Sequence, residues 1–94
     1  MTRDDVLANL RTLKPWLEDQ GVSRVRLFGS HARDEAGPDS DIDLLVDFNQ
    51  SVGLRFFDLE EELSRRLGAP VSIVSESRLN RVILKHALAD AIDA

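Results

Sequence analysis

Two short apolar runs, residues 25–28 and 44–46, flank a polar stretch of the chain. In the first run Val25 and Leu27 alternate with Arg24 and Arg26, a pattern that predicts a half-buried strand with the arginines on its polar face. The second run also suits a strand. Gly29 and Ser30 follow the first run directly. Glycine lets main-chain amides approach a phosphate closely, and the serine adds a hydroxyl donor at an expected helix start. The chain is therefore constrained to form a strand, a polar turn that suits a phosphate, and a second strand in succession.

A pair of aspartates, Asp41 and Asp43, begins the second of these strands. We expect a strand over residues 41–48, and side chains two apart on a strand point to the same face. Two carboxylates at close range repel each other unless a divalent cation lies between them, and their oxygens are ligands that suit Mg²⁺. The pair therefore predicts a magnesium site. The alternative is that Gly29 and Ser30 only begin a helix and that the aspartates only solvate the start of a strand.

The complete pattern resembles the active-site signature of the DNA polymerase beta-like nucleotidyltransferase superfamily. That signature is Gly-Ser-x-Ala-Arg, a short loop, and Ser-Asp-x-Asp-Leu. The matching positions in this chain are Gly29, Ser30, Ala32, Arg33, Ser40, Asp41, Asp43 and Leu44. In particular, the chain is similar to the minimal nucleotidyltransferases, small bacterial proteins that are often paired with a HEPN-domain toxin, and this similarity extends over the rest of the chain.

The resemblance implies an enzyme that transfers a nucleoside monophosphate from a magnesium-bound triphosphate, ATP, to a hydroxyl on a partner HEPN-type toxin, and so acts as an antitoxin. It also implies that Asp41 and Asp43 are the catalytic residues and hold a two-metal site or a reduced one. Nucleotide binding then falls to Gly29, Ser30, Arg33 and Ser40. A second interpretation of Arg33 is that it neutralises the acidic cluster or holds the loop.

The third expected strand departs from the family pattern. The family has a carboxylate there, in a pattern like Val-Asp-Leu-Val, whereas this chain has Ser72 between Val71 and Ile73. Alternation places Ser72 on the face of the strand that carries the site. A serine hydroxyl is a poor Mg²⁺ ligand and is no general base at neutral pH, and a positioned general base typically contributes about 10²–10⁴-fold in rate.

No other acid replaces the missing carboxylate in the sequence. Asp47 lies roughly 13 Å from Asp43 along a strand that rises about 3.3 Å per residue, and Glu76 reaches the site only if the chain folds back. Three outcomes therefore stay open. The chain is a weak enzyme, an enzyme completed by its partner, or a catalytically degenerate nucleotide- and metal-binding subunit that neutralises the toxin by complex formation. A cation- or nucleotide-binding regulatory domain unrelated to a toxin is a further alternative from another class.

Length and charge narrow the class further. The 94 residues suit a single domain over 1–94, and the chain has no cysteine for a disulfide or a thiolate metal site. No signal peptide and no apolar run of membrane length is present, so we expect a cytoplasmic protein and no membrane partner. The net charge of −5 argues against direct polynucleotide binding, which requires a basic surface.

Acidic and basic residues occupy different parts of the chain. Residues 34–62 hold ten acids and one base, whereas residues 63–86 hold five bases and one acid. Solvated helix faces explain most of them. The functional interpretation is that the basic segment meets a triphosphate or an acidic partner. By resemblance, the acidic segment would complement the basic RNA-binding surface of the toxin.

Helices are expected to alternate with these strands, which indicates an α/β fold with helices packed on a small sheet; the resemblance implies that the sheet is mixed. Thr2 is expected to cap a first helix whose apolar stripe runs to Leu17, with a kink or break near Lys14 caused by Pro15. Gly68 is expected to end a helix over 54–67. The remaining expected elements are a short helix from residue 30, a strand over 71–74 and a last helix over 79–92.

Several side chains are expected to have no special chemistry. His31 falls at a variable position of the pattern and is expected to be exposed, and His86 is expected at the surface or in a satisfied core position. The aromatic residues Trp16, Phe56 and Phe57 are expected to be partly buried or in the core. The last helix is expected to bury an apolar face made of Leu79, Val82, Ile83 and Ala87.

Overall fold

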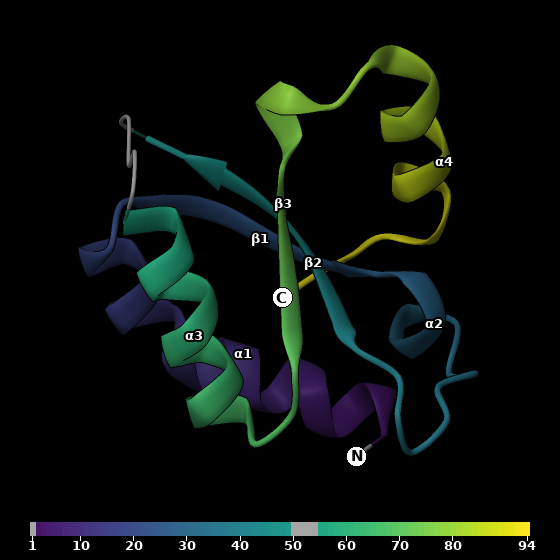
Figure 1. Ribbon diagram of the computed structural model, residues 1–94, viewed down its shortest axis with the longest axis horizontal. Helices are drawn as coiled ribbons and strands as arrows, with labels where there is room; N and C mark the ends of the chain where they lie inside the picture. Colours follow the sequence, from purple (N-terminus) through teal and green to yellow (C-terminus); the bar gives the residue numbers. More distant parts are fainter. Residues whose placement is uncertain (1, 50–54) are drawn as a thin grey trace.

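A computed structural model describes residues 2–49 and 55–94 of the chain (Figure 1). Its elements follow the order α1 (Arg3–Asp19), β1 (Val22–Phe28), α2 (Gly29–Ala32), β2 (Ile42–Phe48), α3 (Arg55–Leu67), β3 (Val71–Ser75), η1 (Glu76–Arg78), α4 (Arg81–Asp90) and β4 (Ile92–Asp93). The expected alternation of helices and strands is confirmed. The 3₁₀ turn η1 and the short strand β4 were not expected.

The four strands form one mixed sheet, as the resemblance implied. Their order is β3-β2-β1-β4, with β1 antiparallel to both β2 and β4 and β2 parallel to β3. Asp43 of β2 is paired with Phe28 on one side and with Ser72 on the other. The strand that carries Asp43 is therefore interior and held from both sides.

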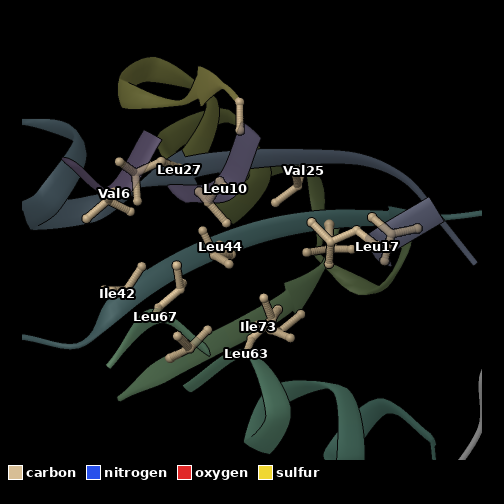
Figure 2. Packing of buried hydrophobic residues seen from close by; sticks show 14 of the residues in the cluster. Val6, Leu10, Leu17, Val25, Leu27, Ile42, Leu44, Leu63, Leu67 and Ile73 are labelled. Atoms are coloured by element: carbon tan, nitrogen blue, oxygen red, sulfur yellow. The ribbon is translucent and has the colours of Figure 1, made fainter. Parts of the chain in front are cut away.

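The main hydrophobic core lies between the sheet and the helices α1 and α3, which Figure 1 shows together on one side of the sheet. Figure 2 shows side chains from both helices meeting those of β1, β2 and β3. The labelled core residues are Val6, Leu10, Leu17, Val25, Leu27, Ile42, Leu44, Leu63, Leu67 and Ile73. Because β2 buries Ile42 and Leu44 in this core, the residue between them, Asp43, points to the opposite face.

Helix α1 has the expected start but no break. Thr2 and Asp5 form a reciprocal capping box: the Thr2 hydroxyl accepts from the Asp5 amide at 3.2 Å, and the Asp5 carboxylate accepts from the Thr2 amide at 3.1 Å. The helix continues through Pro15 to Asp19, so of the predicted kink or break the break is wrong. Leu10 and Leu17 lie on either side of Pro15 and are both buried in the core, and we attribute the continuity to this packing, which offsets the hydrogen bond that proline removes.

Helix α3 covers the outer edge of the sheet. Its predicted core positions Leu59, Leu63 and Leu67 are buried. The Glu60 carboxylate accepts from the amide of Ile73 at 2.9 Å and the Ser64 hydroxyl accepts from that of Val71 at 3.0 Å. These bonds satisfy donors of the edge strand β3, which would otherwise need another partner. The predicted first residue of this helix, Leu54, lies outside the described residues.

The C-terminal part differs most from expectation. Helix α4 starts after Asn80, because the Asn80 side chain accepts from the amide of Ile83 at 2.9 Å and caps the helix there. The predicted buried face of this helix is wrong: Val82 is 67% and Ile83 52% exposed, and Ala87 alone of the four is buried. The helix contacts β1 and α2 instead of the main core, so only one narrow side of it is covered.

Two smaller predictions need adjustment. Strand β1 begins at Val22, before the expected residue 25, and pairs there with Phe48. Phe57 is 66% exposed and not a core residue, whereas Phe56 packs partly buried against the core as expected. Trp16 is also partly buried, and the guanidinium of Arg66 lies 4.3 Å from the centre of its ring. Within the described ranges, no helix has the length and apolar character to cross a membrane.

Candidate functional site

The predicted site residues gather where β1 ends, α2 begins and β2 starts. Gly29 is the first residue of α2 and follows Phe28, the β1 residue that is paired with Asp43. Ser72 of β3 is the register partner of Asp43 on the other side. Register partners on adjacent strands point to the same face of a sheet. The expectation that Ser72 occupies the site's face of the third strand is therefore confirmed.

Gly29 is required here for two independent reasons. Its φ is +75°, a left-handed conformation that side-chain-bearing residues avoid. A Cβ at this position would also collide with Oδ2 of Asp43 and lie 3.3 Å from the Cβ of Asp43. The Asp43 carboxylate therefore lies directly against the main chain at the start of α2, which gives the glycine a role beyond the predicted approach to a phosphate.

The two aspartates influence each other, but not as two residues of one strand. Asp41 is exposed and precedes β2, which starts at Ile42, so the expected strand start is wrong by one residue. Asp43 is half-buried, and its pKa is raised first by this burial and then by the negative charge of Asp41. His31 and Arg33 lower the pKa of Asp43 by smaller amounts. The folded chain thus holds Asp43 where its ionised form is destabilised.

His31 is buried, with 6% exposure, and the expectation that it is an exposed helix residue is wrong. Its Nδ1 lies 3.0 Å from the main-chain oxygen of Asp41. Because a carbonyl oxygen only accepts, the Nδ1–H group of His31 is the donor. Sequence reasoning missed this contact, because it joins residues ten apart across a loop and no periodic pattern reports it.

Arg33 and Ser40 hold the loop between α2 and β2. Arg33 forms ion pairs with Glu35 and with Asp90 of α4, each at 3.1 Å, and these hydrogen bonds raise its pKa. The Ser40 hydroxyl accepts from the amide of Gly37 at 3.0 Å and closes a turn. For Arg33 this geometry favours the interpretation that it holds the loop. The predicted nucleotide-binding roles of Arg33 and Ser40 stay predictions, as does that of half-buried Ser30.

The acids considered as replacements for a third carboxylate lie in a separate cluster. Glu76 pairs with buried Arg26 at 3.4 Å, and its pKa is raised first by a side-chain hydrogen bond to Asp47. Asp47 therefore engages Glu76, and Glu76 pairs with Arg26, so neither extends the pair of Asp41 and Asp43. The burial of Arg26, which alternation alone placed on a polar face, was also missed.

The available carboxylates suit a metal ion that also binds oxygen atoms of a ligand. Within residues 2–49 and 55–94, no group of three or more His, Cys, Asp or Glu side chains is placed to hold a metal ion. Two neighbouring carboxylates are what Mg²⁺ uses when it keeps several waters and takes further oxygens from substrate phosphates. Mutual repulsion in the pair is also relieved by a cation. Asp41 and Asp43 therefore suit such an ion, and an all-protein cage is not formed.

Comparison with known proteins identifies the family of this chain. The nucleotidyltransferase domain family matches residues 10–93, and the chain belongs to this family of transferases. The protein adenylyltransferase MntA of Thermococcus cleftensis is 37% identical over 94 residues, covering 98% of this chain and 95% of the relative. A candidate protein adenylyltransferase of Methanocaldococcus jannaschii is 34% identical over 84 residues, covering 88% of this chain and 90% of that protein.

Solved structures show the same fold. A minimal nucleotidyltransferase superposes with a TM-score of 0.84 at 38% identity, covering 98% of this chain and 95% of the other. The MNT antitoxin complex with the tri-AMPylated HEPN toxin of Shewanella oneidensis matches with a TM-score of 0.70 at 19% identity, over 92% of this chain and 68% of that chain. A toxin–antitoxin structure with AMP-PNP matches with a TM-score of 0.72, also at 19% identity, over 99% of this chain and 72% of that chain.

Replacing Asp43 by Asn is expected to stabilise the metal-free protein at neutral pH. The pKa of Asp43 is raised in the folded chain. The free energy of unfolding therefore falls as the pH rises through the pKa of this carboxyl group and it ionises. Asp93→Asn is the control of opposite sign, because Arg24 lowers the pKa of Asp93 and the ionised form stabilises the fold. Thermal melting at pH 7 without divalent ions should show a higher Tm for the first variant and a lower Tm for the second. Equal or reversed shifts would contradict the site's electrostatics.

Gly29→Ala is expected to reduce stability more than Gly68→Ala. Both residues have positive φ, which costs an alanine about 1–2 kcal/mol. A new Cβ at Gly68 meets nothing within 4 Å, whereas one at Gly29 collides with Asp43. Urea denaturation measures the difference. Equal losses would show that Asp43 moves away without cost and that its carboxylate is not held against α2.

Proposed function

We propose that this chain is a protein adenylyltransferase that transfers AMP from ATP to a hydroxyl of a partner protein. The observation that carries the proposal is the Asp43 carboxylate, which lies against Gly29 and is destabilised by Asp41. A carboxylate pair beside a glycine turn suits a triphosphate that binds as its complex with a divalent cation. The 37% identity to a protein adenylyltransferase over nearly all of both chains supports the same reaction.

In this reaction the acceptor hydroxyl oxygen forms a bond to the α-phosphorus of ATP. The bond from that phosphorus to the bridging oxygen breaks, pyrophosphate leaves with the electron pair, and the hydroxyl proton is released. Gly29 and Ser30 would receive the triphosphate at the start of α2. Asp41 and Asp43 would hold Mg²⁺, which supplies positive charge at the phosphoryl oxygens. Ser72, beside Asp43, provides no base, so the proton has no carboxylate acceptor on β3.

The partner that we propose is a HEPN-type toxin, and the chain would then act as its antitoxin. The fold-level match to the Shewanella oneidensis complex of a HEPN toxin with an MNT antitoxin supports this choice. Fewer acids of the segment 34–62 are available to a basic partner than its sequence suggests. Acids of the segment 34–62 that stay exposed beside the site are Asp34, Glu35, Asp39 and Asp41. Glu60 and Glu62 are engaged by β3 and by α3 arginines, so the loop between α2 and β2 is the proposed contact.

A second candidate is neutralisation of the toxin by complex formation alone. Ser72 favours it, because the β3 position beside Asp43 carries no carboxylate. In this case the chain would still bind nucleotide and metal, and suppression of toxin cleavage would not depend on AMP transfer. The two candidates differ in whether the aspartates are needed for neutralisation.

The double substitution Asp41→Asn with Asp43→Asn is expected to abolish label transfer from radiolabelled ATP to the proposed HEPN-type partner, for which the product of the adjacent gene is the first candidate to test. It should also abolish the stabilisation by Mg²⁺ and ATP, which for the wild type would be about 2.7 kcal/mol at a ligand concentration 100 times Kd. Asp58→Asn with Glu61→Gln, exposed acids of α3, is the matched control and should behave as wild type.

Toxin RNA cleavage in the same mixtures separates the candidates. Adenylyl transfer predicts that Asp43→Asn alone, which leaves the exposed contact residue Asp41 in place, no longer suppresses cleavage. Suppression by that variant, with no label transferred by the wild type, would refute the enzyme and leave neutralisation by contact.

Ser72→Asp is expected to accelerate AMP transfer, by as much as the roughly 10²–10⁴-fold of a positioned base. Its side chain would stand beside Asp43 on the same face, because the two positions are in register. Ser72→Asn is the uncharged control and should give no gain. The measurement is initial rate with Mg²⁺ and partner present. A folded Ser72→Asp protein that binds ATP but reacts no faster would show that more than this carboxylate separates the chain from full activity, or that none is needed.

A further inference from the structure

The peptide group between Asp41 and Ile42 is held from both ends. Its oxygen accepts from Nδ1 of His31 at 3.0 Å, and its N–H group, that of Ile42, donates to the carbonyl of Pro70 at 2.9 Å. The oxygen and the hydrogen of a trans peptide point in opposite directions. His31 of α2 and Pro70, which precedes β3, therefore form hydrogen bonds with this peptide group from opposite sides.

This peptide is the link between the two carboxylates of the site. Asp41 lies on one side of Ile42 and Asp43 on the other. Ile42 is fully buried and paired with Val71, so the Asp43 side is fixed by the sheet. Asp41 precedes β2 and has no partner in the described strand registers. The hydrogen bond from His31, together with the bond to Pro70, thus fixes the main chain on the Asp41 side, and the bond from His31 is made by a side chain that can be substituted.

We propose that His31 is a positioning residue that holds Asp41 at the correct distance from Asp43 for a shared divalent cation. The inference rests on the proposed function of the site. Two ionised carboxylates at close range repel each other, which favours movement of exposed Asp41 away from Asp43 when no cation is bound. The hydrogen bond from buried His31 to the main-chain oxygen of Asp41 opposes this movement before a cation binds. Less conformational entropy is therefore lost when the cation binds.

The position of the donor within the side chain matters. Nδ1 of histidine is attached to Cγ, and the amide nitrogen of asparagine is attached to the same carbon, so His31→Asn keeps an N–H donor at that place. Glutamine places its amide one carbon further out, and leucine has no donor. Partners that orient metal ligands typically contribute 10–100-fold to metal affinity.

The test is the affinity for a non-hydrolysable ATP analogue, measured by calorimetry with Mn²⁺ and again with EDTA. We expect His31→Leu and His31→Gln to lose about tenfold of the Mn²⁺-dependent affinity, with affinity in EDTA unchanged. His31→Asn should retain the wild-type value. Amide hydrogen exchange at Ile42, measured without metal, should accelerate in the Leu and Gln variants and not in the Asn variant.

Each outcome decides the proposal. Equal Mn²⁺-dependent affinity in all four proteins would overturn it, as would an equal loss in Asn, Gln and Leu variants, which would indicate packing of the ring alone. A wild type that binds the analogue no better with Mn²⁺ would overturn both the positioning role and the metal site. A wild type that binds with Mn²⁺ but transfers no AMP to the partner would refute adenylyl transfer only, and the variants would still decide the role of His31.

Discussion

The fit of Asp43 against Gly29 is the contact on which the site depends. It brings a carboxylate into van der Waals range of the main chain at the start of α2, where only glycine is accommodated. Burial there and the charge of Asp41 both disfavour the ionised carboxylate. The folded protein keeps Asp43 at this unfavourable position, and unfavourable ionisation of this kind is typical of binding sites. A divalent cation with a triphosphate would remove this unfavourable effect.

Helix α2, although only four residues long, supports both carboxylates. Gly29 provides the surface for Asp43, and His31 binds the main chain of Asp41. The helix is itself held by Arg33, which reaches Asp90 of α4, while α1 and α3 bury the opposite face of β2 and keep it rigid. The site is therefore placed by contacts from every layer of the fold, and its precision does not come from the motif residues alone.

Patterns that repeat along the chain could be predicted from the sequence, whereas contacts between distant segments could not. The stripe of α1 and the site-facing position of Ser72 follow from helix and strand periods and are confirmed. Alternation also predicted that Arg26 lies off the core face. It did not predict the ion pairs that Arg26 forms with Glu76 and Asp93. The contact from His31 to Asp41 and the two-residue strand β4 depend on tertiary neighbours. For α4, apolar spacing was misleading, because a small domain leaves part of an amphipathic helix uncovered.

The central claim is that Asp41 and Asp43 form a divalent cation site completed by a nucleotide. A crystal structure of the chain with Mn²⁺ and a non-hydrolysable ATP analogue, with an anomalous difference map, tests it most directly. The account predicts an anomalous peak bonded to carboxylate oxygens of both Asp41 and Asp43, with the triphosphate against Gly29 and Ser30. A peak at Asp47 and Glu76, or a bound nucleotide whose phosphates lie away from α2, would contradict it.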